Sequence, residues 1–191
     1  MKIAYFKTVI ILLGLTVSSI SCKAQTLPLN TALTNIPNNA YVKDTNNELL
    51  PYVGTYKTNF QGKEITLFIT KEENKVVDYG DQQFHRDALV IKYIVKNSSG
   101  TVLQDTKNSN TLVTEFHSTK IRSTQNSIIF YYGGTNCGVG WGEINLKKIN
   151  ATQISWEYHP NDIVTTASKC PPNLDTTIYL PETKDLIFTK Q

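Results

Sequence analysis

The stretch LVIKYIVK at residues 89–96 carries the clearest signal of the fold. Its apolar residues from Leu89 to Val95 recur at every second position, with Lys92 and Lys96 among the residues between them. Because successive side chains of a β-strand point to opposite faces, a period of two predicts a strand with one face in a core. Residues 65–70, ITLFIT, repeat the alternation.

Further strands are predicted along the rest of the chain. They cover residues 112–116, 127–132, 143–148, 153–158, 177–180 and 186–189. Turn-forming clusters of Asn, Asp, Ser and Gly separate several of the strands, at residues 59–62, 78–81, 97–100 and 107–110. The chain has 24 Thr and only 7 Ala, a composition that disfavours helices. We therefore expect an all-β fold, an antiparallel meander of about 8–10 strands that forms either a closed barrel or a sandwich.

The 191 residues suffice for one domain with short additions. Residues 49–191 are expected to form a single β domain. Residues 22–48 are rich in Asn and Thr, contain Pro28 and Pro37, and show no sustained period. This segment is interpreted as an N-terminal tether, or as a strap across the domain.

The first residues have the pattern of a secretory signal peptide. Lys2 and Lys7 precede an uncharged apolar stretch at residues 8–21, which is too short to span a bilayer. Two maturation routes stay open after the predicted signal peptide at residues 1–21. Cys22 is either acylated, which gives a lipoprotein anchored in the cell envelope, or it is removed by cleavage after Ala24. The second route releases a soluble periplasmic or secreted protein that starts at Gln25.

Removal of the leader changes the charge of the protein. The full chain has a net charge of +3 and a pI of about 8.6. Loss of Lys2 and Lys7 lowers the net charge to +1, and cleavage after Ala24, which also removes Lys23, lowers it to zero. A mature protein without excess positive charge is a poor nucleic-acid binder, so no nucleic-acid partner is predicted.

Two cysteines remain beside Cys22. Cys137 and Cys170 form an even pair, and in an oxidising compartment the expected state is one disulfide. A redox role is disfavoured because the chain has no Cys-x-x-Cys motif.

The predicted hairpin of residues 143–148 and 152–158 contains a candidate acid pair. A three-residue turn, with Asn150 left-handed, would set Leu146 opposite Ile154 and Ile144 opposite Trp156. Glu143 would then face Glu157 on the polar side, where two close carboxylates can share a proton. The competing interpretation is a solvated pair without catalytic use.

Half of the ten glycines lie within residues 133–142. The segment lacks a phosphate-loop pattern. Gly138 and Gly140 fall on the face of the predicted strand that is apolar further along. This face has no side chains at the glycines. Either the segment that carries Cys170 packs against it, or it forms the entrance of a pocket. Trp141 points to the opposite, more polar face and is a weak candidate for ligand contact.

No cofactor, metal site or catalytic residue is predicted. His85, His117 and His159 lie in separate segments without the spacing of zinc ligands. Ser, His and Asp are present, but no Gly-x-Ser-x-Gly nucleophile elbow occurs.

Several motifs together resemble an uncharacterised family of Bacteroidota envelope lipoproteins. They are YVKD at residues 41–44, YVGTY at 52–56, CGVG at 137–140, ISWEY at 154–158 and LIFTKQ at 186–191. The leader ending SCKAQ, residues 21–25, is also common in that family. The resemblance implies export, and it implies no activity because the family is one of unknown function.

Gly54-Thr55-Tyr56 resembles the Gly-x-Trp motif that opens the first strand of lipocalin-like barrels. The resemblance implies that Tyr56 closes the base of a barrel, and it favours a barrel over a sandwich. Lipocalins pair this aromatic residue with an arginine near the last strand, whereas Arg86 and Arg122 lie far from the C-terminus. A barrel of about eight strands has room for one small ligand, which makes Tyr56 a candidate contact.

Three hypotheses of function follow. The first is an envelope protein that binds a small apolar or amphipathic ligand in a β-barrel. The second is a structural or interaction protein of the envelope whose protein partner is unknown. The third is a hydrolase that uses Glu143 and Glu157. The first two are favoured, and the membrane is a partner if Cys22 is acylated.

Overall fold

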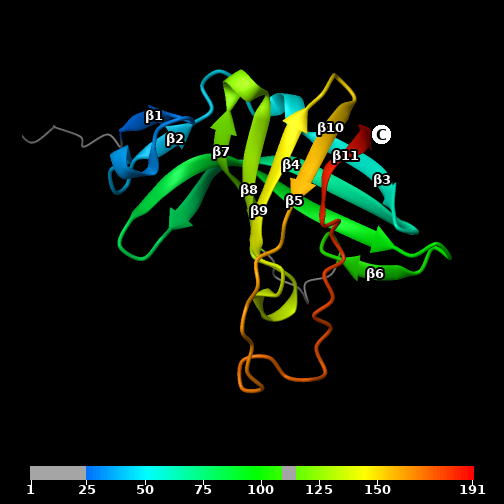
Figure 1. The fold of residues 1–191 in the computed structure, drawn as a ribbon. Coiled ribbons are helices and arrows are strands. Elements are labelled where there is room, and N and C mark those ends of the chain that lie inside the picture. The colour runs from blue at the N-terminus through cyan, green and yellow to red at the C-terminus, as the bar shows by residue number, and fades with distance from the viewer. Residues whose placement is uncertain (1–24, 109–114) are drawn as a thin grey trace, which may run out of the picture.

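A computed structural model describes residues 25–108 and 115–191 (Figure 1). The predicted signal peptide, the predicted acylation site at Cys22, and positions 112 and 114 of one predicted strand lie outside these residues. No helix within the described ranges is long and apolar enough to cross a membrane. The short 3-10 helices are η2 (Leu33–Asn35), η3 (Leu50–Tyr52), η4 (Ser123–Gln125) and η5 (Asn136–Gly138).

Eight strands form a closed antiparallel barrel. They are β3 (Gly54–Phe60), β4 (Lys63–Asp78), β5 (Gln83–Lys96), β7 (Phe116–Arg122), β8 (Ser127–Tyr132), β9 (Gly142–Lys148), β10 (Gln153–Tyr158) and β11 (Thr183–Lys190). Each strand pairs with the next along the chain, β11 returns to β3, and Val90 pairs with His117 to join β5 to β7. The short strand β6 (Val102–Asp105) pairs only with β5. The expected all-β meander, closed as a lipocalin-like barrel, is confirmed.

The strands predicted wholly within the described residues lie in the sheet with one exception, and of the strand predicted at residues 112–116 only Phe116 is found in a strand, β7. Residues 127–132 and 153–158 are strands with the expected bounds, and β4 and β5 extend beyond the stretches that alternate. The strand predicted at residues 177–180 is wrong, because this segment makes no ladder and belongs to the connection from β10 to β11. Its apolar residues Ile178 and Leu180 pack on the core instead. At residues 177–180 the alternation of apolar and polar residues therefore reflects burial of one side of the segment, although its backbone pairs with no strand.

Aromatic side chains fill the barrel interior. Tyr93, Tyr132 and Trp156 are each at most 1% exposed. Phe116 packs against Trp156 and Tyr132, with ring centroids 6.4 and 5.2 Å apart. The hydroxyl groups of Tyr93 and Tyr132 lie 3.0 Å apart, and the Trp156 indole donates a 2.8 Å hydrogen bond to the carbonyl of Pro181. The interior is a packed core in which these hydroxyl and indole groups are hydrogen-bonded.

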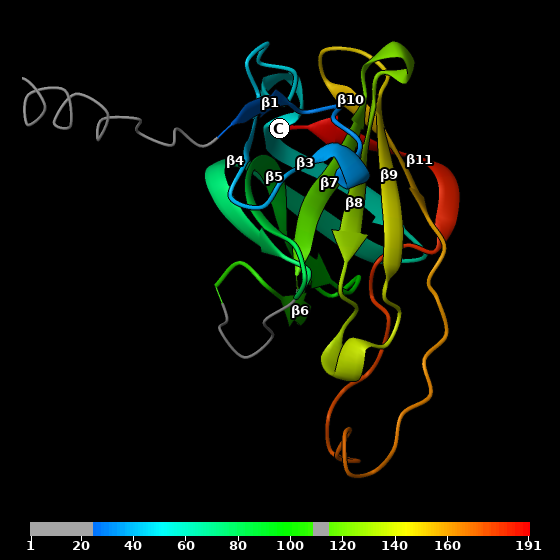
Figure 2. The same cartoon turned by 90° about the vertical axis from the view of Figure 1, so that its left-hand side faces the viewer.

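The described part of the N-terminal segment is a strap on the barrel. Strands β1 (Thr26–Pro28) and β2 (Tyr41–Lys43) pair in parallel, and β2 also pairs in parallel with β5. The carboxylate of Asp87 accepts hydrogen bonds from the Tyr41 hydroxyl and from the Asp44 backbone N–H. These contacts fix the segment to the barrel wall (Figure 2).

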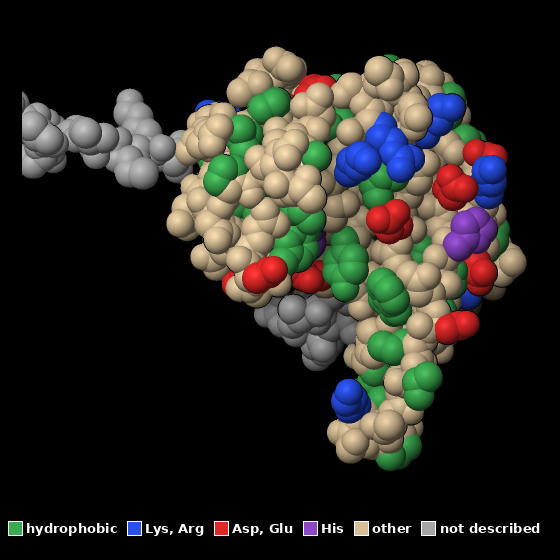
Figure 3. Space-filling view, turned by 60° about the vertical axis from the view of Figure 1, so that its left-hand side comes forward, with side chains coloured by type: hydrophobic (Ala, Val, Ile, Leu, Met, Phe, Trp, Pro, Cys, Tyr) green, Lys and Arg blue, Asp and Glu red, His purple; other side chains and the backbone are tan. Residues whose placement is uncertain are grey.

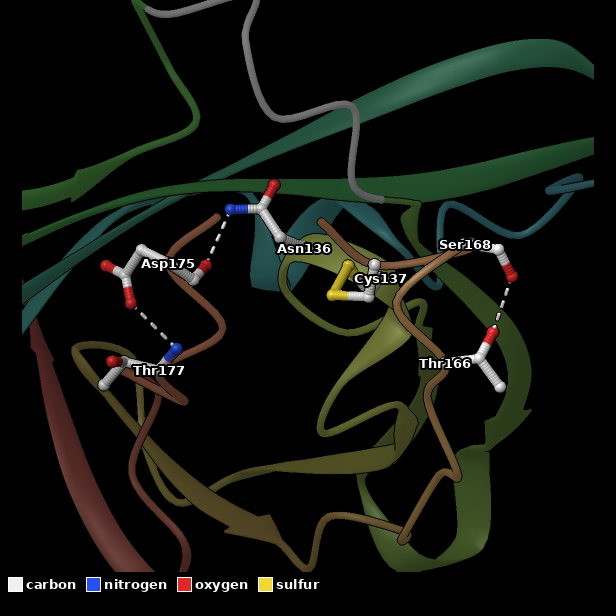
Figure 4. Close-up of a disulfide and its surroundings, with 7 residues drawn as sticks. Asn136, Cys137, Thr166, Ser168, Asp175 and Thr177 are labelled. Atoms are coloured by element: carbon white, nitrogen blue, oxygen red, sulfur yellow. Dashed lines mark hydrogen bonds between the residues drawn. A yellow bond between two sulfur atoms is a disulfide. The ribbon is translucent and has the colours of Figure 1, made fainter. Parts of the chain in front are cut away.

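A long connection between β10 and β11 hangs below the barrel in Figure 1. The predicted disulfide is confirmed, because Cys137 and Cys170 are bonded with their Cα atoms 5.5 Å apart. Figure 4 shows how a hydrogen bond from the Asn136 side chain to the Asp175 carbonyl, 2.7 Å long, supports the same junction. The connection is thus tied to the segment between β8 and β9.

Candidate functional site

The register of β9 and β10 differs from the predicted one. Leu146 faces Trp156 and Ile144 faces Tyr158. The predicted turn is wrong because the loop ends one residue later: Ile149 N–H still bonds to the Gln153 carbonyl at 3.0 Å. Asn150 stabilises the loop by accepting a 2.9 Å hydrogen bond from the Thr152 N–H, and it is not left-handed.

The predicted acid pair is corrected by this register. Glu157 faces Asn145 on β9, while Glu143 faces Tyr131 on β8. The two carboxylates are therefore diagonal neighbours rather than direct partners. Since a shift of two residues keeps the same faces outward, Glu143, Asn145 and Glu157 still share the outer face of the barrel.

Three adjoining hollows cross this outer face, which carries β7 to β10. One of about 540 Å³ and one of about 420 Å³ share Asn145 and Glu157. A third, of about 470 Å³, shares Glu143 with the second and reaches Tyr79 at the far end of β4. We call these three hollows together the outer groove.

Small and buried residues form the floor of the outer groove. Ser127, Ile129 and Ser155 point outward, yet they are only 2%, 5% and 5% exposed. Ser127 and Ser155 flank the long side chain of Lys147 on β9. The short side chains of Ser127 and Ser155 leave a depression in the surface, and the longer side chain of Lys147 borders it.

Three buried polar atoms in the outer groove have no hydrogen-bond partner. Among the described residues, buried side-chain atoms without a partner are His117 Nδ1, Ser127 Oγ and Asn145 Oδ1. Each of the three hollows is lined by at least one of these residues. A buried polar group without a partner costs about 1–3 kcal/mol, so such atoms are rare in native structures. All three atoms belong to residues that line the outer groove.

The charges of the two hollows that share Asn145 are balanced, and the third hollow adds Asp78 and Glu115. Arg122, Lys147 and Lys184 face the same hollows as Glu143, Glu157 and Asp185. The space-filling view shows basic, acidic and histidine side chains close together on the right of the molecule (Figure 3). Asn145 Nδ2 also lies 3.4 Å from the Glu157 carboxylate, which fixes the direction of the amide.

One of the two histidines that line the groove, His117, has a lowered pKa. Burial lowers the pKa of His117 below its ordinary value of 6.5, and the nearby carboxylate of Glu115 offsets this only in part. The imidazole packs against Tyr131, with ring centroids 5.9 Å apart. A neutral imidazole can donate or accept at Nδ1 according to its tautomer.

Trp141 lies next to one end of the groove. The Asn161 N–H bonds to the Trp141 carbonyl at 2.8 Å, which continues the β9–β10 ladder beyond Tyr158. By strand alternation Trp141 therefore shares the outer face with Glu143. Its indole is 39% exposed, and the indole N–H points to the Asp162 carbonyl at 3.4 Å.

The other predicted contact residues lie elsewhere. A Cβ atom at Gly140 would come within 2.8 Å of Ile178, and one at Gly138 within 3.6 Å of Ile163. The β10–β11 connection, which carries Cys170, thus covers both glycines. Tyr56 is 1% exposed and belongs to the core.

Sequence reasoning missed the polar residues of the groove floor. Ser127, Asn145 and Ser155 lie on three strands, and only the correct register brings them together. A weak signal was present, since each is a small polar residue at an outward position between long side chains. Within residues 25–108 and 115–191, no group of three or more His, Cys, Asp or Glu residues could hold a metal ion.

The fold and the groove define an up-and-down β-barrel protein with a polar surface site outside a filled core. The chain belongs to a family of unknown function, DUF6705, whose family model matches residues 6–191. No curated protein and no solved structure matches it.

Proposed function

We propose that this protein is an exported binding protein of the cell envelope that holds a ligand in the outer groove. The observation that carries the proposal is the presence of His117 Nδ1, Ser127 Oγ and Asn145 Oδ1 as buried atoms without partners in that one groove. Because these atoms are buried in the ligand-free protein, the proposal includes a small rotation of their side chains that lets a ligand bond to them and offset the cost of leaving them unpaired.

The proposed site is the outer groove rather than the barrel interior. Packing of Tyr93, Phe116 and Trp156 against neighbouring rings supports this choice, because a small apolar ligand inside would have to displace them. We propose binding without catalysis, because Glu143 and Glu157 are diagonal neighbours and do not form the directly opposed acid pair on which the hydrolase hypothesis rests.

Export and membrane anchoring form the second part of the proposal. The leader pattern ending at Cys22 supports acylation of that residue, and the bond between Cys137 and Cys170 suits an oxidising compartment. Intact-mass spectrometry on protein expressed with its own leader tests this part. The expected mass is that of residues 22–191 plus the acyl chains on Cys22. A mass that corresponds to residues 25–191 would show a soluble form and overturn the lipid anchor. A mass that still includes residues 1–21 would overturn export.

Native mass spectrometry tests the binding part. The protein, incubated with envelope extract and repurified, is expected to carry an additional mass that denaturation releases. Asn145→Leu should lose this mass because it removes the amide from the groove. Asn59→Leu, an exposed asparagine on β3, is the matched control and should keep it. Equal behaviour of the two variants, or no additional mass on the parent protein, would overturn the binding function and favour a structural or interaction role.

A further inference from the structure

We infer that the ligand of the outer groove is a neutral oligosaccharide that lies along β9. The inference rests on the proposed binding function and adds the chemical class of the ligand. It follows from the charge balance of the groove, the direction of its backbone hydrogen bonds, its length and the residue beside one end.

The charge of the two hollows along β9 favours a neutral ligand with many hydroxyl groups. Their three basic and three acidic side chains leave no net charge to attract an anion or a cation, whereas the third hollow adds Asp78 and Glu115 and is acidic. The groove offers donors such as Arg122 and acceptors such as Glu157 side by side. A hydroxyl group both donates and accepts, so a sugar can satisfy neighbouring groups of both kinds.

The backbone around the groove disfavours an extended peptide. Peptides that add a strand need a free sheet edge with unpaired N–H and C=O groups. Strands β8, β9 and β10 are each paired on both sides. Recognition at this face therefore runs through side chains alone, and a peptide backbone laid there would leave its own amides without regular partners.

The shape of the site favours a chain over a single sugar. Trp141, Glu143, Asn145 and Lys147 follow one another at every second position. At about 3.4 Å per strand residue, this row extends for roughly 20 Å. Two hollows that share Asn145 lie along it.

Trp141 supplies an apolar platform at the end of this row. Its half-exposed ring carries negative charge density on its faces, which attracts the C–H groups on the flat side of a sugar ring. The hydrogen bond from its indole N–H to Asp162 holds the ring in place before a ligand arrives. A fixed ring beside polar groups suits a ligand that has an apolar face and a polar rim.

Isothermal titration calorimetry with defined hexasaccharides tests the inference. The probes are the neutral hexamers of β-1,4-glucose, α-1,4-glucose, β-1,3-glucose, β-1,4-xylose, β-1,4-mannose and N-acetylglucosamine, with an oligogalacturonate and a lysine hexapeptide as charged controls. At least one neutral hexamer is expected to bind. Trp141→Ala and Asn145→Leu should each weaken it by about tenfold or more, on the scale of one lost buried contact. Trp141→Phe should retain most of the affinity, and Asn59→Leu all of it.

Failure of the inference differs from failure of the proposed function. If no neutral hexamer binds, or if the charged controls bind better, the oligosaccharide is excluded as the ligand class. The binding function still holds in that case if material from the envelope extract is retained by the parent protein and lost in Asn145→Leu. Acid hydrolysis of that material should release sugars, and release of amino acids or fatty acids alone would also overturn the inference. Absence of any retained material would overturn both.

Discussion

Lys190 covers the ring of Tyr56 at the end of the barrel where the first and last strands meet. Its Nζ atom lies 5.7 Å from the ring centroid and donates a 2.7 Å hydrogen bond to the Val53 carbonyl. The lipocalin resemblance implies a cation near the last strand that pairs with this aromatic residue. Lys190 of β11 places a cation over the ring of Tyr56 near the last strand.

Loss of this lysine should destabilise the barrel closure. Lys190→Ala removes a cation–π contact and a hydrogen bond to the backbone, so we expect a loss of about 1–2 kcal/mol in the free energy of unfolding. Lys190→Arg should recover part of this loss. Urea denaturation measures the effect, with Lys92→Ala, an exposed lysine on β5, as the control. Equal stability of Lys190→Ala and Lys92→Ala would argue against a closing role.

The disulfide should contribute a large share of the stability. The Cys137–Cys170 bond closes a loop with a sequence separation of 33 residues. The chain-entropy account then gives about 3–4 kcal/mol, which the double variant Cys137→Ser/Cys170→Ser should lose. Urea denaturation with and without a reductant measures this. The reductant should have no effect on the double variant, and an unchanged parent protein in reductant would refute the estimate.

The strap should loosen in acid. Burial alone would raise the pKa of Asp87, but hydrogen bonds from the Tyr41 hydroxyl and from the Asp44 and Asn74 amides hold it below its ordinary value of 3.8. A lowered folded-state pKa stabilises the protein at pH values above 3.8 and loses that effect as the pH falls through the folded value. The protection factors of the Tyr41 and His85 amides in hydrogen exchange, which are corrected for the pH dependence of the intrinsic rate, should therefore fall below about pH 4.

The variant Asp87→Asn provides the check on this prediction. It should lose about 1–3 kcal/mol at neutral pH, because hydrogen bonds to a charged acceptor are stronger than those to an amide. Its strap should show little further loosening between pH 5 and about 3, the range in which a free aspartate titrates. A parent protein whose strap amides keep the same protection factors across this range would contradict the assigned role of Asp87.

His117 should stay neutral at pH values where a free histidine becomes protonated. Burial lowers its pKa, so the folded protein is stabilised above the unfolded value of 6.5 and loses that contribution as the pH falls through the folded value. An NMR titration of the imidazole carbon-bound protons is expected to give a midpoint below 6.5. A midpoint at or above that of a histidine-containing model peptide would show that the ring is solvated.

The fold could be predicted from the sequence because it depends mainly on one pattern, the alternation of apolar and polar residues. Alternation in residues 65–70 and 89–96 predicts strands, and short turns between most strands predict a meander. The connection at residues 177–180 was misjudged, since Ile178 and Leu180 alternate for burial without a paired backbone. Alternation alone does not distinguish a strand paired in a sheet from an unpaired segment that is buried on one side.

The candidate site was far less accessible. It depends on which residues of β8, β9 and β10 stand side by side, and that depends on whether the loop between β9 and β10 begins at Ile149, as predicted, or at Asn150, as observed. The prediction misplaced the ends of both strands by one residue. It therefore paired Glu157 with Glu143, whereas the structure pairs Glu157 with Asn145. The buried serines on the outer face carry no sequence motif, and the hollow above them arises only from the assembled sheet.

The most direct test of the central claim is a ¹⁵N NMR titration of the protein with the neutral hexasaccharides. The account predicts that the Asn145 side-chain amide and the Trp141 indole N–H shift together and saturate, while the Asn59 amide stays in place. The barrel interior should not respond. Signals of Asn145 and Trp141 that do not move, or shifts confined to interior residues such as Ile144 and Leu146, would contradict a ligand site in the outer groove.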